Sequence, residues 1–334
     1  MQTENPKLKI KLLFWLTLGV LSTFFAEVIS GSTPFPFIPI MGLWGLLVVL
    51  PLYTLHTLVF AYFVYRFGKP VFHTLFFAGA LFGMYEAYAT GVLWAGWSTP
   101  PPIAVFELGI IETLVLVLFW HPVFAFMLPV IFAQTSLTQS NESLPSVANF
   151  TTRKALIILA VIFAFVQSLN MVSPAMALMV NLTSIPVVAL FIFIWLKLEL
   201  NRYSMRELLP NKTEFRIIFV LMLLQYVFLG AVSIGKYPGV SGHISVLALY
   251  LILILIFVKS LRASRQTVDQ HIEQPSFSWR GFVLLSIIFT LAAMMFSFGV
   301  MFLKPGIWVP VLLIYSLSGI VFFGIAIRQV FKKT

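Results

Sequence analysis

The sequence predicts an all-α, polytopic integral membrane protein with about ten transmembrane helices and both termini in the cytoplasm. Three observations carry this prediction. Hydrophobic residues make up 60% of the 334 residues and charged residues only 10%, which is far from the composition of a soluble globular domain. The apolar residues gather in long runs, and the basic residues fall in alternate connections between those runs. Bilayer lipid is therefore an expected partner of the chain.

The apolar runs are predicted to be helices because each reaches about 20 residues, the length that crosses the hydrocarbon core. Strands of a membrane barrel would be about ten residues long with alternating polarity, and these runs do not alternate. We count ten runs, near residues 11–30, 41–65, 71–95, 103–133, 155–172, 175–197, 214–234, 243–261, 281–303 and 307–328.

The basic residues predict the orientation of the chain. Of the 21 Lys and Arg residues, all but Lys236 and Lys304 lie in connections on one side of the predicted bundle. Cytoplasmic connections carry the excess of Lys and Arg, so this side is predicted to be cytoplasmic, in a prokaryotic cell membrane. The net charge of +10 then reflects membrane topology, and nucleic acid is not an expected partner.

The polar stretch 135–154 is predicted to be a cytoplasmic loop between two membrane units. It is rich in Ser, Thr, Gln and Asn, and acidic residues occur within the apolar runs only before it. We therefore expect a four-helix unit over 1–134 and a six-helix unit over 155–334. The chain has no cysteine, which excludes disulfides, thiolate metal sites and cysteine nucleophiles.

The stretch 79–97 is the most informative, because it places Glu86 in the middle of an apolar run. A carboxylate at a helix centre is unfavourable by about 2.5–3.5 kcal/mol on insertion scales, so it marks a candidate functional site. Gly79, Gly83, Glu86, Thr90 and Trp97 recur at helical spacing and are predicted to share one face. The pair Gly79 and Gly83 should let another helix approach closely.

Three further glutamates are predicted to lie within the membrane. Glu27 follows Gly19 and Thr23 at steps of four, at the outer end of the first run. Glu107 and Glu112 both fall in the fourth run, five residues apart, so they cannot share a helix face. An alternative for the first thirty residues is a signal peptide, whose removal would take Glu27 with it.

Aromatic and basic residues complete the predicted site. His56 is expected to look into the bundle from the second run, although most buried histidines only hydrogen-bond a neighbouring helix. Trp94 and Trp97 lie at the outer turn, where tryptophan is usually an interfacial anchor. Lys236, Lys304 and His243 are possible ion-pair partners for the glutamates from the same side.

Two resemblances to known families are visible. The segment Gly83-Met-Tyr-Glu86 resembles the glutamate motif of the CPBP intramembrane protease family, which has paired glutamates followed by arginine. Ala87 stands where the second glutamate would be and no arginine follows, so no function is carried over. Ten helices in about 300 residues are similar in topology to drug/metabolite transporters, with no shared motif.

Four intramembrane glutamates need protonation, ion pairing or a bound cation to offset the cost of their burial. The leading hypothesis is a proton- or cation-coupled transporter of a small molecule or ion, with a carboxylate-lined pocket in the outer half of the bundle. An intramembrane enzyme using metal or acid/base chemistry on a lipid-soluble or peptide substrate is the first alternative. A scaffold without catalytic activity is the second. No cofactor is predicted, and a bound cation is compatible with the first two hypotheses.

Overall fold

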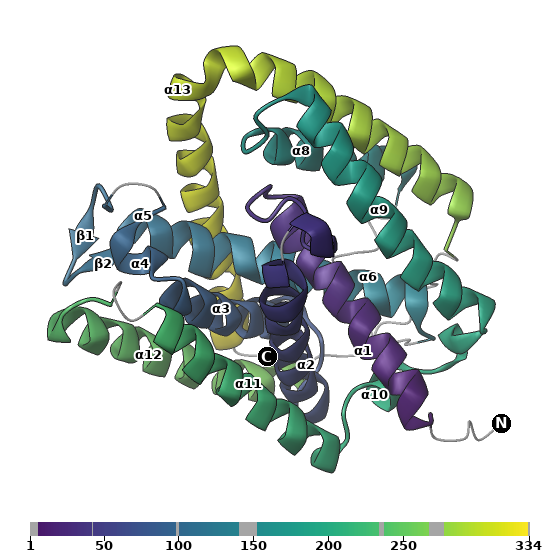
Figure 1. Cartoon of the computed structure of the whole chain (residues 1–334). Helices are drawn as coiled ribbons and strands as arrows, with labels where there is room; N and C mark the ends of the chain where they lie inside the picture. Colours follow the sequence, from purple (N-terminus) through teal and green to yellow (C-terminus); the bar gives the residue numbers. More distant parts are fainter. Residues whose placement is uncertain are drawn as a thin grey trace. The chain divides into compact units, whose positions relative to one another are not determined.

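The computed structural model describes residues 6–41, 43–97, 100–139, 152–233, 237–266 and 277–332. These ranges are helical almost throughout (Figure 1), as the sequence predicts, and they divide into two compact units. Each unit is built from three stretches that alternate along the chain: 1–54, 128–209 and 269–309 in unit 1, and 55–127, 210–268 and 310–334 in unit 2. The expected boundary at 135–154 falls inside unit 1.

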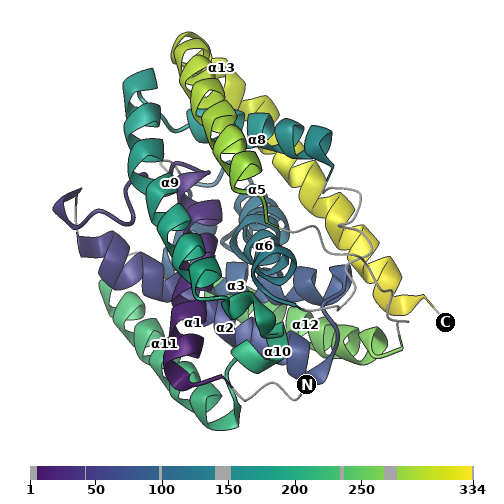
Figure 2. The same ribbon diagram turned by 90° about the vertical axis from the view of Figure 1, so that its right-hand side faces the viewer.

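Unit 1 is centred on helix α1, which packs against α9 and α6 in both views (Figures 1 and 2). The Nε1 atom of Trp15 donates to the carbonyl of Leu208 at 2.8 Å, and that of Trp195 donates to the carbonyl of Leu137 at 2.7 Å. The helical elements of this unit are α1 (Leu8–Thr23), η1 (Phe24–Val28), η2 (Pro39–Met41), η3 (Gly45–Val49), the start of α2 (Leu50–Phe67), α6 (Leu128–Leu137), α8 (Arg153–Ser168), α9 (Pro174–Lys197), η6 (Leu200–Arg202), α10 (Met205–Leu208) and the first part of α13 (Trp279–Phe331).

Amide side chains join α8 to α9 in unit 1. Gln167 and Asn181 exchange two hydrogen bonds, at 2.9 and 3.1 Å, and Gln167 also donates to the carbonyl of Val28. The turn between the two helices ends at Ser173, whose hydroxyl caps α9. Polar groups that the sequence places within apolar runs therefore bond across helices, as expected where lipid offers no partner.

Unit 2 is centred on helix α3, which lies against η4, α12 and α11. All but three of the 18 residues of α3 are buried, so this helix is enclosed by protein. The elements of unit 2 are the rest of α2, α3 (Phe72–Ala89), α4 (Val92–Ala95), β1 (Ala104–Val105), β2 (Leu108–Gly109), α5 (Ile110–Glu112), η4 (Thr113–Met127), α11 (Lys212–Val232), α12 (Val240–Ser264) and the end of α13. The two short strands pair antiparallel, with Val105 opposite Leu108.

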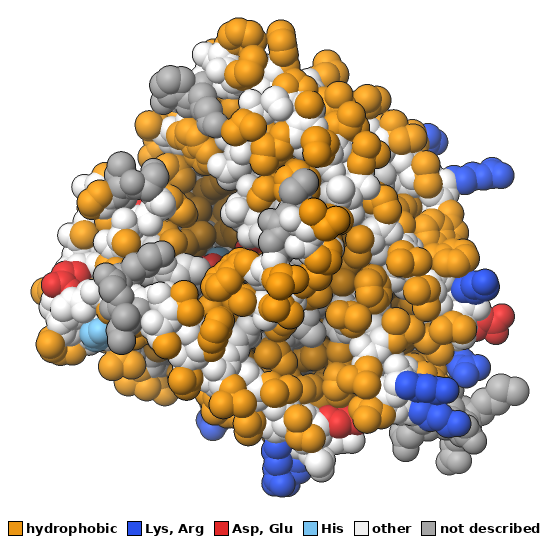
Figure 3. Space-filling view, viewed as in Figure 1, with side chains coloured by type: hydrophobic (Ala, Val, Ile, Leu, Met, Phe, Trp, Pro, Cys, Tyr) orange, Lys and Arg blue, Asp and Glu red, His pale blue; other side chains and the backbone are white. Residues whose placement is uncertain are grey.

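Eight helical segments among the described residues are long and apolar enough to cross a membrane. The prediction of ten spans is therefore not confirmed. The predicted run 155–172 forms α8, which has only 16 residues, and the run 71–95 forms the 18-residue α3, which is not among the eight. Apolar side chains cover most of the face in Figure 3, and a group of Lys and Arg side chains lies near the start of α1.

Three predicted features differ in the structure. The helix that carries Glu86 ends at Ala89, since Gly91 adopts a φ of 74°, so Trp97 does not share its face. Glu107 lies outside any helix, in the turn between β1 and β2. Lys304-Pro305-Gly306, predicted as an outer turn, falls within the continuous helical stretch α13, where two candidate spans meet.

Candidate functional site

Glycines bring α3 and η4 of unit 2 into close contact. A Cβ atom on Gly79 would lie 2.5 Å from the Cα atom of Pro122, and one on Gly83 would lie 2.8 Å from the Cβ atom of His121. At such distances a larger residue would require the neighbouring helix to shift. The prediction that this glycine pair permits close helix approach is confirmed, and η4 is the helix that approaches.

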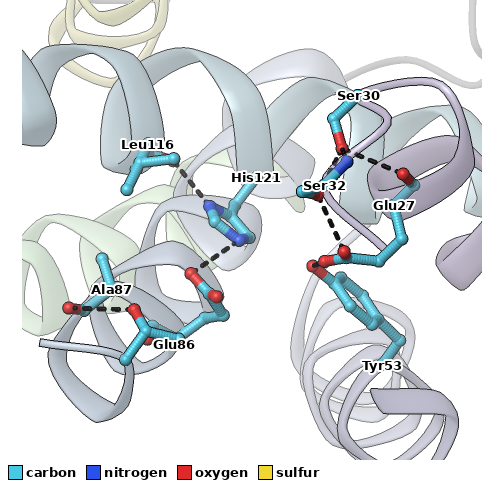
Figure 4. Close-up of polar contacts among 9 residues, drawn as sticks. Glu27, Ser30, Ser32, Tyr53, Glu86, Ala87, Leu116 and His121 are labelled. Atoms are coloured by element: carbon cyan, nitrogen blue, oxygen red, sulfur yellow. Dashed lines mark hydrogen bonds and ion pairs between the residues drawn. The ribbon is translucent and has the colours of Figure 1, made fainter. Parts of the chain in front are cut away.

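Glu86 and His121 meet at this contact (Figure 4). The Oε2 atom of Glu86 lies 3.1 Å from the Nε2 atom of His121, and the two side chains are 15% and 3% exposed. The other ring nitrogen of His121, Nδ1, lies 2.9 Å from the carbonyl oxygen of Leu116. The pair therefore joins two titratable groups from neighbouring helices within an enclosed part of unit 2.

The carbonyl of Leu116 determines where the protons of this pair must be. A carbonyl only accepts hydrogen bonds, so the Nδ1 atom of His121 carries a proton. The contact between Nε2 and Glu86 then needs one further proton, either on the imidazole or on the carboxyl. When that proton leaves, a nitrogen lone pair faces a carboxylate and the attraction is lost. The geometry is thus that of a hydrogen bond that needs one proton between Nε2 of His121 and Oε2 of Glu86.

His56 lies in the same unit, on α2, and it is fully buried. Its Nε2 atom lies 2.9 Å from the hydroxyl of Tyr226 on α11. Its ring stacks on Phe82, Tyr85 and Tyr226, with centroid distances of 4.8, 4.7 and 5.3 Å. The ring of Phe82 also contacts His121, at 5.7 Å. The prediction that His56 faces the interior of the bundle is therefore confirmed, and Phe82 touches both histidines.

Glu107 lies at the tip of the β1–β2 hairpin and is exposed. Phe106 and Glu107 both have positive φ, 49° and 63°, as the two central residues of a type I′ turn require. The Oε2 atom of Glu107 accepts a hydrogen bond from the backbone N–H of Gly242 at 3.3 Å. Glu107 therefore caps the first turn of α12, where a negative charge is favourable. The prediction that Glu107 lies within the fourth helix is wrong, whereas Glu112 does lie in that helical segment.

Four partly buried rings gather beside this cap. Tyr88 ends α3, Trp94 lies on α4, and Tyr237 and His243 flank the start of α12. The ring centroids of all six pairs lie between 5.2 and 6.4 Å apart. Burial, and then the nearby phenol of Tyr88, raise the pKa of Tyr237 above its ordinary value, so its ring stays a neutral phenol. We call these four residues the aromatic cluster.

Glu112 is the most deeply buried of the predicted glutamates, at 1% exposure. Its Oε2 atom has no hydrogen-bond partner among the described residues, and a Cβ atom on Gly109 would clash with that oxygen.

Trp97 is exposed at 46% and stands apart from the aromatic cluster. Lys236 lies outside the described residues, and the side chain of Lys304 is not described. His243 contacts Tyr88, with its Nδ1 atom 3.4 Å from the hydroxyl.

Glu27 belongs to unit 1 and has its own partners (Figure 4). Its Oε1 atom accepts a hydrogen bond from the hydroxyl of Tyr53 at 2.5 Å, and its Oε2 atom accepts one from Ser32 at 2.8 Å. Ser30 in turn contacts Ser32 and the backbone carbonyl of Glu27. The side chain is 9% exposed. Hydroxyl donors thus satisfy both oxygens of this carboxylate.

The structure brings predicted residues together in two places within unit 2. Glu107, Trp94 and His243 share one neighbourhood, and Glu86 has a histidine partner close to His56. The sequence analysis did not assign His121, Tyr226 or Phe82 to the site. Among the described residues, no three His, Asp or Glu side chains are grouped so that they could hold a metal ion.

Comparison with known proteins supports the membrane assignment. The model of a family described as "Uncharacterized membrane protein family" matches residues 16–333. The chain belongs to this family. A protein of Archaeoglobus fulgidus, described as "Uncharacterized protein", is 32% identical over 277 residues, which cover 80% of this chain and 85% of that relative. No solved structure matches the chain. The protein is thus a multi-pass membrane protein of this family.

Proposed function

We propose that the protein is a proton-coupled transporter of a small molecule, and that Glu86 and His121 form its proton-binding site. The observation that carries the proposal is the 3.1 Å contact between these two side chains, with the second imidazole nitrogen held by the carbonyl of Leu116. Ionisable residues within a helical membrane bundle are costly and commonly mark proton pathways. Imidazole is also the side chain that ordinarily titrates between pH 5 and 8.

Proton exchange at this pair would act directly on helix packing. The contact that joins α3 to η4 is strongest while one proton is shared, so loss of the proton weakens the link between the two helices. A second proton weakens it less, because the carbonyl oxygen of the neutral carboxylic acid still accepts a hydrogen bond from the imidazolium. Transport requires that a bound proton favour one of two arrangements of the helices. A protonation-dependent link between packed helices meets that requirement.

The position of Glu86 supports this role over a static ion pair. Its carboxylate is partly exposed, whereas His121 is almost fully buried. A proton can therefore reach the pair from the carboxylate side. The contrast with Glu27 lies in the partners. Glu27 is bonded by the hydroxyl groups of Tyr53 and Ser32, which do not release protons near neutral pH.

We further propose that the protein resides in a prokaryotic cell membrane with both termini in the cytoplasm. The support is the distribution of Lys and Arg between alternate connections, together with the relative from Archaeoglobus fulgidus. Single cysteines introduced at Lys69 and at Tyr237 should react with an impermeant reagent from opposite sides of the membrane. Reaction from the same side would contradict the orientation.

Proton movement in liposomes tests the transport proposal. Purified protein is reconstituted with a pH-sensitive dye inside, and a panel of amino acids, sugars, organic cations and organic anions is added outside. We expect one class to move protons with the wild-type protein and not with Glu86→Gln. Glu207→Gln is the matched control, because Glu207 completes a capping box on α10 in which Gln serves as well.

Two results would overturn the proposal. The first is undiminished solute-driven proton movement in a folded Glu86→Gln protein. The second is a nitrogen-15 NMR spectrum of labelled histidine in which His121 has a protonation state that does not change between pH 5 and 8. The NMR measurement needs no knowledge of the solute.

A further inference from the structure

Basic side chains gather at one end of unit 2, where the two helices α12 and α13 finish. They are Lys259 and Arg262 in the last turns of α12, and Arg328 and Lys332 in the last turn of α13 and just beyond it. The Nζ atom of Lys259 lies 3.5 Å from the ring centroid of Phe331, so the two helix ends are in contact. Each end also terminates a candidate membrane span, which places the four cations at the level of the lipid headgroups. We call these four residues the basic cluster.

The basic cluster holds positive charge that the described part of the chain does not neutralise. All four side chains are exposed, and among the described residues none of them forms an ion pair with a carboxylate. Neither α12 nor α13 contains an acidic residue. A single cation near a helix C-terminus is favourable, but like charges three or four residues apart on one helix repel each other. Each helix carries such a pair, and a bound anion would offset the repulsion.

Exposed apolar side chains lead along each helix to the basic cluster. The two sets, each spaced by four, three and four residues, are Leu251, Leu255, Val258 and Arg262 on α12 and Val321, Ile325, Arg328 and Lys332 on α13. This spacing places each set on one helix face. The apolar members are between 41% and 61% exposed. Each face therefore offers apolar surface for an acyl chain and, at its end, cations for a headgroup.

The contact between Lys259 and Phe331 sets the two faces side by side. At about 100° per helical residue, Lys259 lies on one flank of the α12 face and Phe331 lies on the opposite flank of the α13 face. Because both helices finish at the same end and these opposite flanks touch, the two faces adjoin. Phe331 is itself 55% exposed, so its ring extends the apolar surface up to the cations.

We propose that the basic cluster binds the phosphate headgroup of an anionic phospholipid, whose acyl chains lie along the two apolar faces. The guanidinium groups of Arg262 and Arg328 can each pair with two phosphate oxygens, and the lysines add positive charge. Basic clusters at the end of a membrane span attract anionic lipids. A water-soluble phosphate compound would contact the cations and leave the apolar faces unused. Lipid binding here does not depend on the proton coupling proposed above.

Competition between lipids tests the proposal. Purified protein in an uncharged detergent is titrated with phosphatidylglycerol or with phosphatidylcholine of the same acyl chains, and bound lipid is counted by native mass spectrometry. We expect phosphatidylglycerol to bind more tightly, by about fivefold for each basic residue that contacts the headgroup. Glycerophosphoglycerol, the same headgroup without acyl chains, should not displace it at equal concentration. Equal binding of the two lipids, or displacement by glycerophosphoglycerol, would overturn the proposal.

Variants then locate the site. Arg262→Gln combined with Arg328→Gln should weaken phosphatidylglycerol binding about 25-fold, because two of the basic contacts are removed. The matched control combines Lys7→Gln with Lys9→Gln, which removes the same charge from exposed positions at the start of α1 in unit 1. This control should bind the lipid as wild type does. An equal loss in both double variants would show that net charge alone attracts the lipid, and this result would contradict the site.

A charge-conserving variant separates recognition from folding. Arg262→Lys combined with Arg328→Lys keeps both charges and should retain most of the preference for phosphatidylglycerol over phosphatidylcholine. Since both arginines are exposed, the unfolding temperatures of the variants should stay close to that of wild type. Undiminished phosphatidylglycerol binding in the folded Arg262→Gln, Arg328→Gln protein would refute the assignment of the headgroup to the basic cluster.

Discussion

The two units of the protein each bury a glutamate, and they satisfy its charge in different ways. In unit 1, Glu27 accepts hydrogen bonds from Tyr53 and Ser32, which are neutral donors. In unit 2, Glu86 faces the imidazole of His121, which is itself titratable. Both carboxylates come from apolar helices and both were predicted as one class of residue. Their partners, which periodicity does not reveal, are neutral hydroxyl groups for Glu27 and a titratable imidazole for Glu86.

The difference shows that burial of a charge is by itself a weak indicator of function. The carboxylate of Glu27 has hydroxyl donors on both oxygens, and its bond to Ser32 ties down the turn that follows η1. The carboxylate of Glu86 instead faces a titratable imidazole, and the two groups of such a pair titrate together. The chemistry of the partner is therefore the difference that suits Glu86, and not Glu27, to the role in coupling that we propose.

The largest expected effect is that of His121→Leu. This variant leaves Glu86 without its partner in an enclosed position, and removal of one member of a buried pair typically costs about 3–5 kcal/mol. The free energy of unfolding, measured by SDS titration in mixed micelles, should fall by about 3 kcal/mol. The double variant with Glu86→Met should recover most of it. If the double variant is as unstable as the single one, the contact does not explain the loss.

The second effect compares the closest helix approaches in the two units. Gly79→Ala should destabilise the protein by about 2 kcal/mol, because the new methyl group meets the backbone of Pro122. Gly19→Ala in unit 1 meets the Oγ1 and Cβ atoms of Thr54, and rotation of that side chain does not move its Cβ atom, so its cost should be of the same order, about 2 kcal/mol. Gly299→Ala, with open space around it, is the control. Thermal unfolding in detergent would measure all three.

Tyr53→Phe should have an intermediate effect. It removes one hydroxyl donor from Glu27, and hydrogen bonds to charged groups contribute about 1.5–3 kcal/mol. We expect a loss near 1.5 kcal/mol in unfolding free energy, with no change in proton movement by reconstituted protein. Altered proton coupling in Tyr53→Phe would abolish the distinction drawn between the two glutamates.

The smallest effect is expected for Gln167→Leu in unit 1. The amide pair with Asn181 is neutral, and such interhelical bonds contribute about 0.6 kcal/mol on average in membranes. Equilibrium unfolding should show a change of this order. A loss as large as that of His121→Leu would mean that neutral and titratable pairs contribute alike, which contradicts the comparison.

The sequence alone predicted side-chain positions correctly where the residues lie on one regular α-helix. Regular spacing placed Gly79, Gly83 and Glu86 together, and the structure confirms the close approach that the glycines allow. The prediction from sequence failed where the backbone is not α-helical. Gly91 ends α3 before Trp97, and a hairpin with two positive φ values carries Glu107.

The partner of Glu86 could not be predicted for a related reason. The segment Thr113–Met127 has the wider turns of a π-helix, so residues of η4 do not repeat on a face at the usual 3.6-residue interval. The 3.6-residue repeat of an α-helix, counted from Glu112, therefore predicts the wrong helix face for His121. The pairing depends on which helix meets the glycine face, and that is set by contacts distant in sequence.

The enclosure of α3 has a consequence for how the protein responds to its membrane. Hydrophobic mismatch acts on helices that touch acyl chains, through tilt or local thinning of the bilayer. Nearly every residue of α3 is buried, so a change in bilayer thickness reaches Glu86 through the helices packed on α3, which include α2, η4, α11, α12 and the end of α13. Proton affinity at that residue should accordingly be almost the same in short-chain and long-chain lipids.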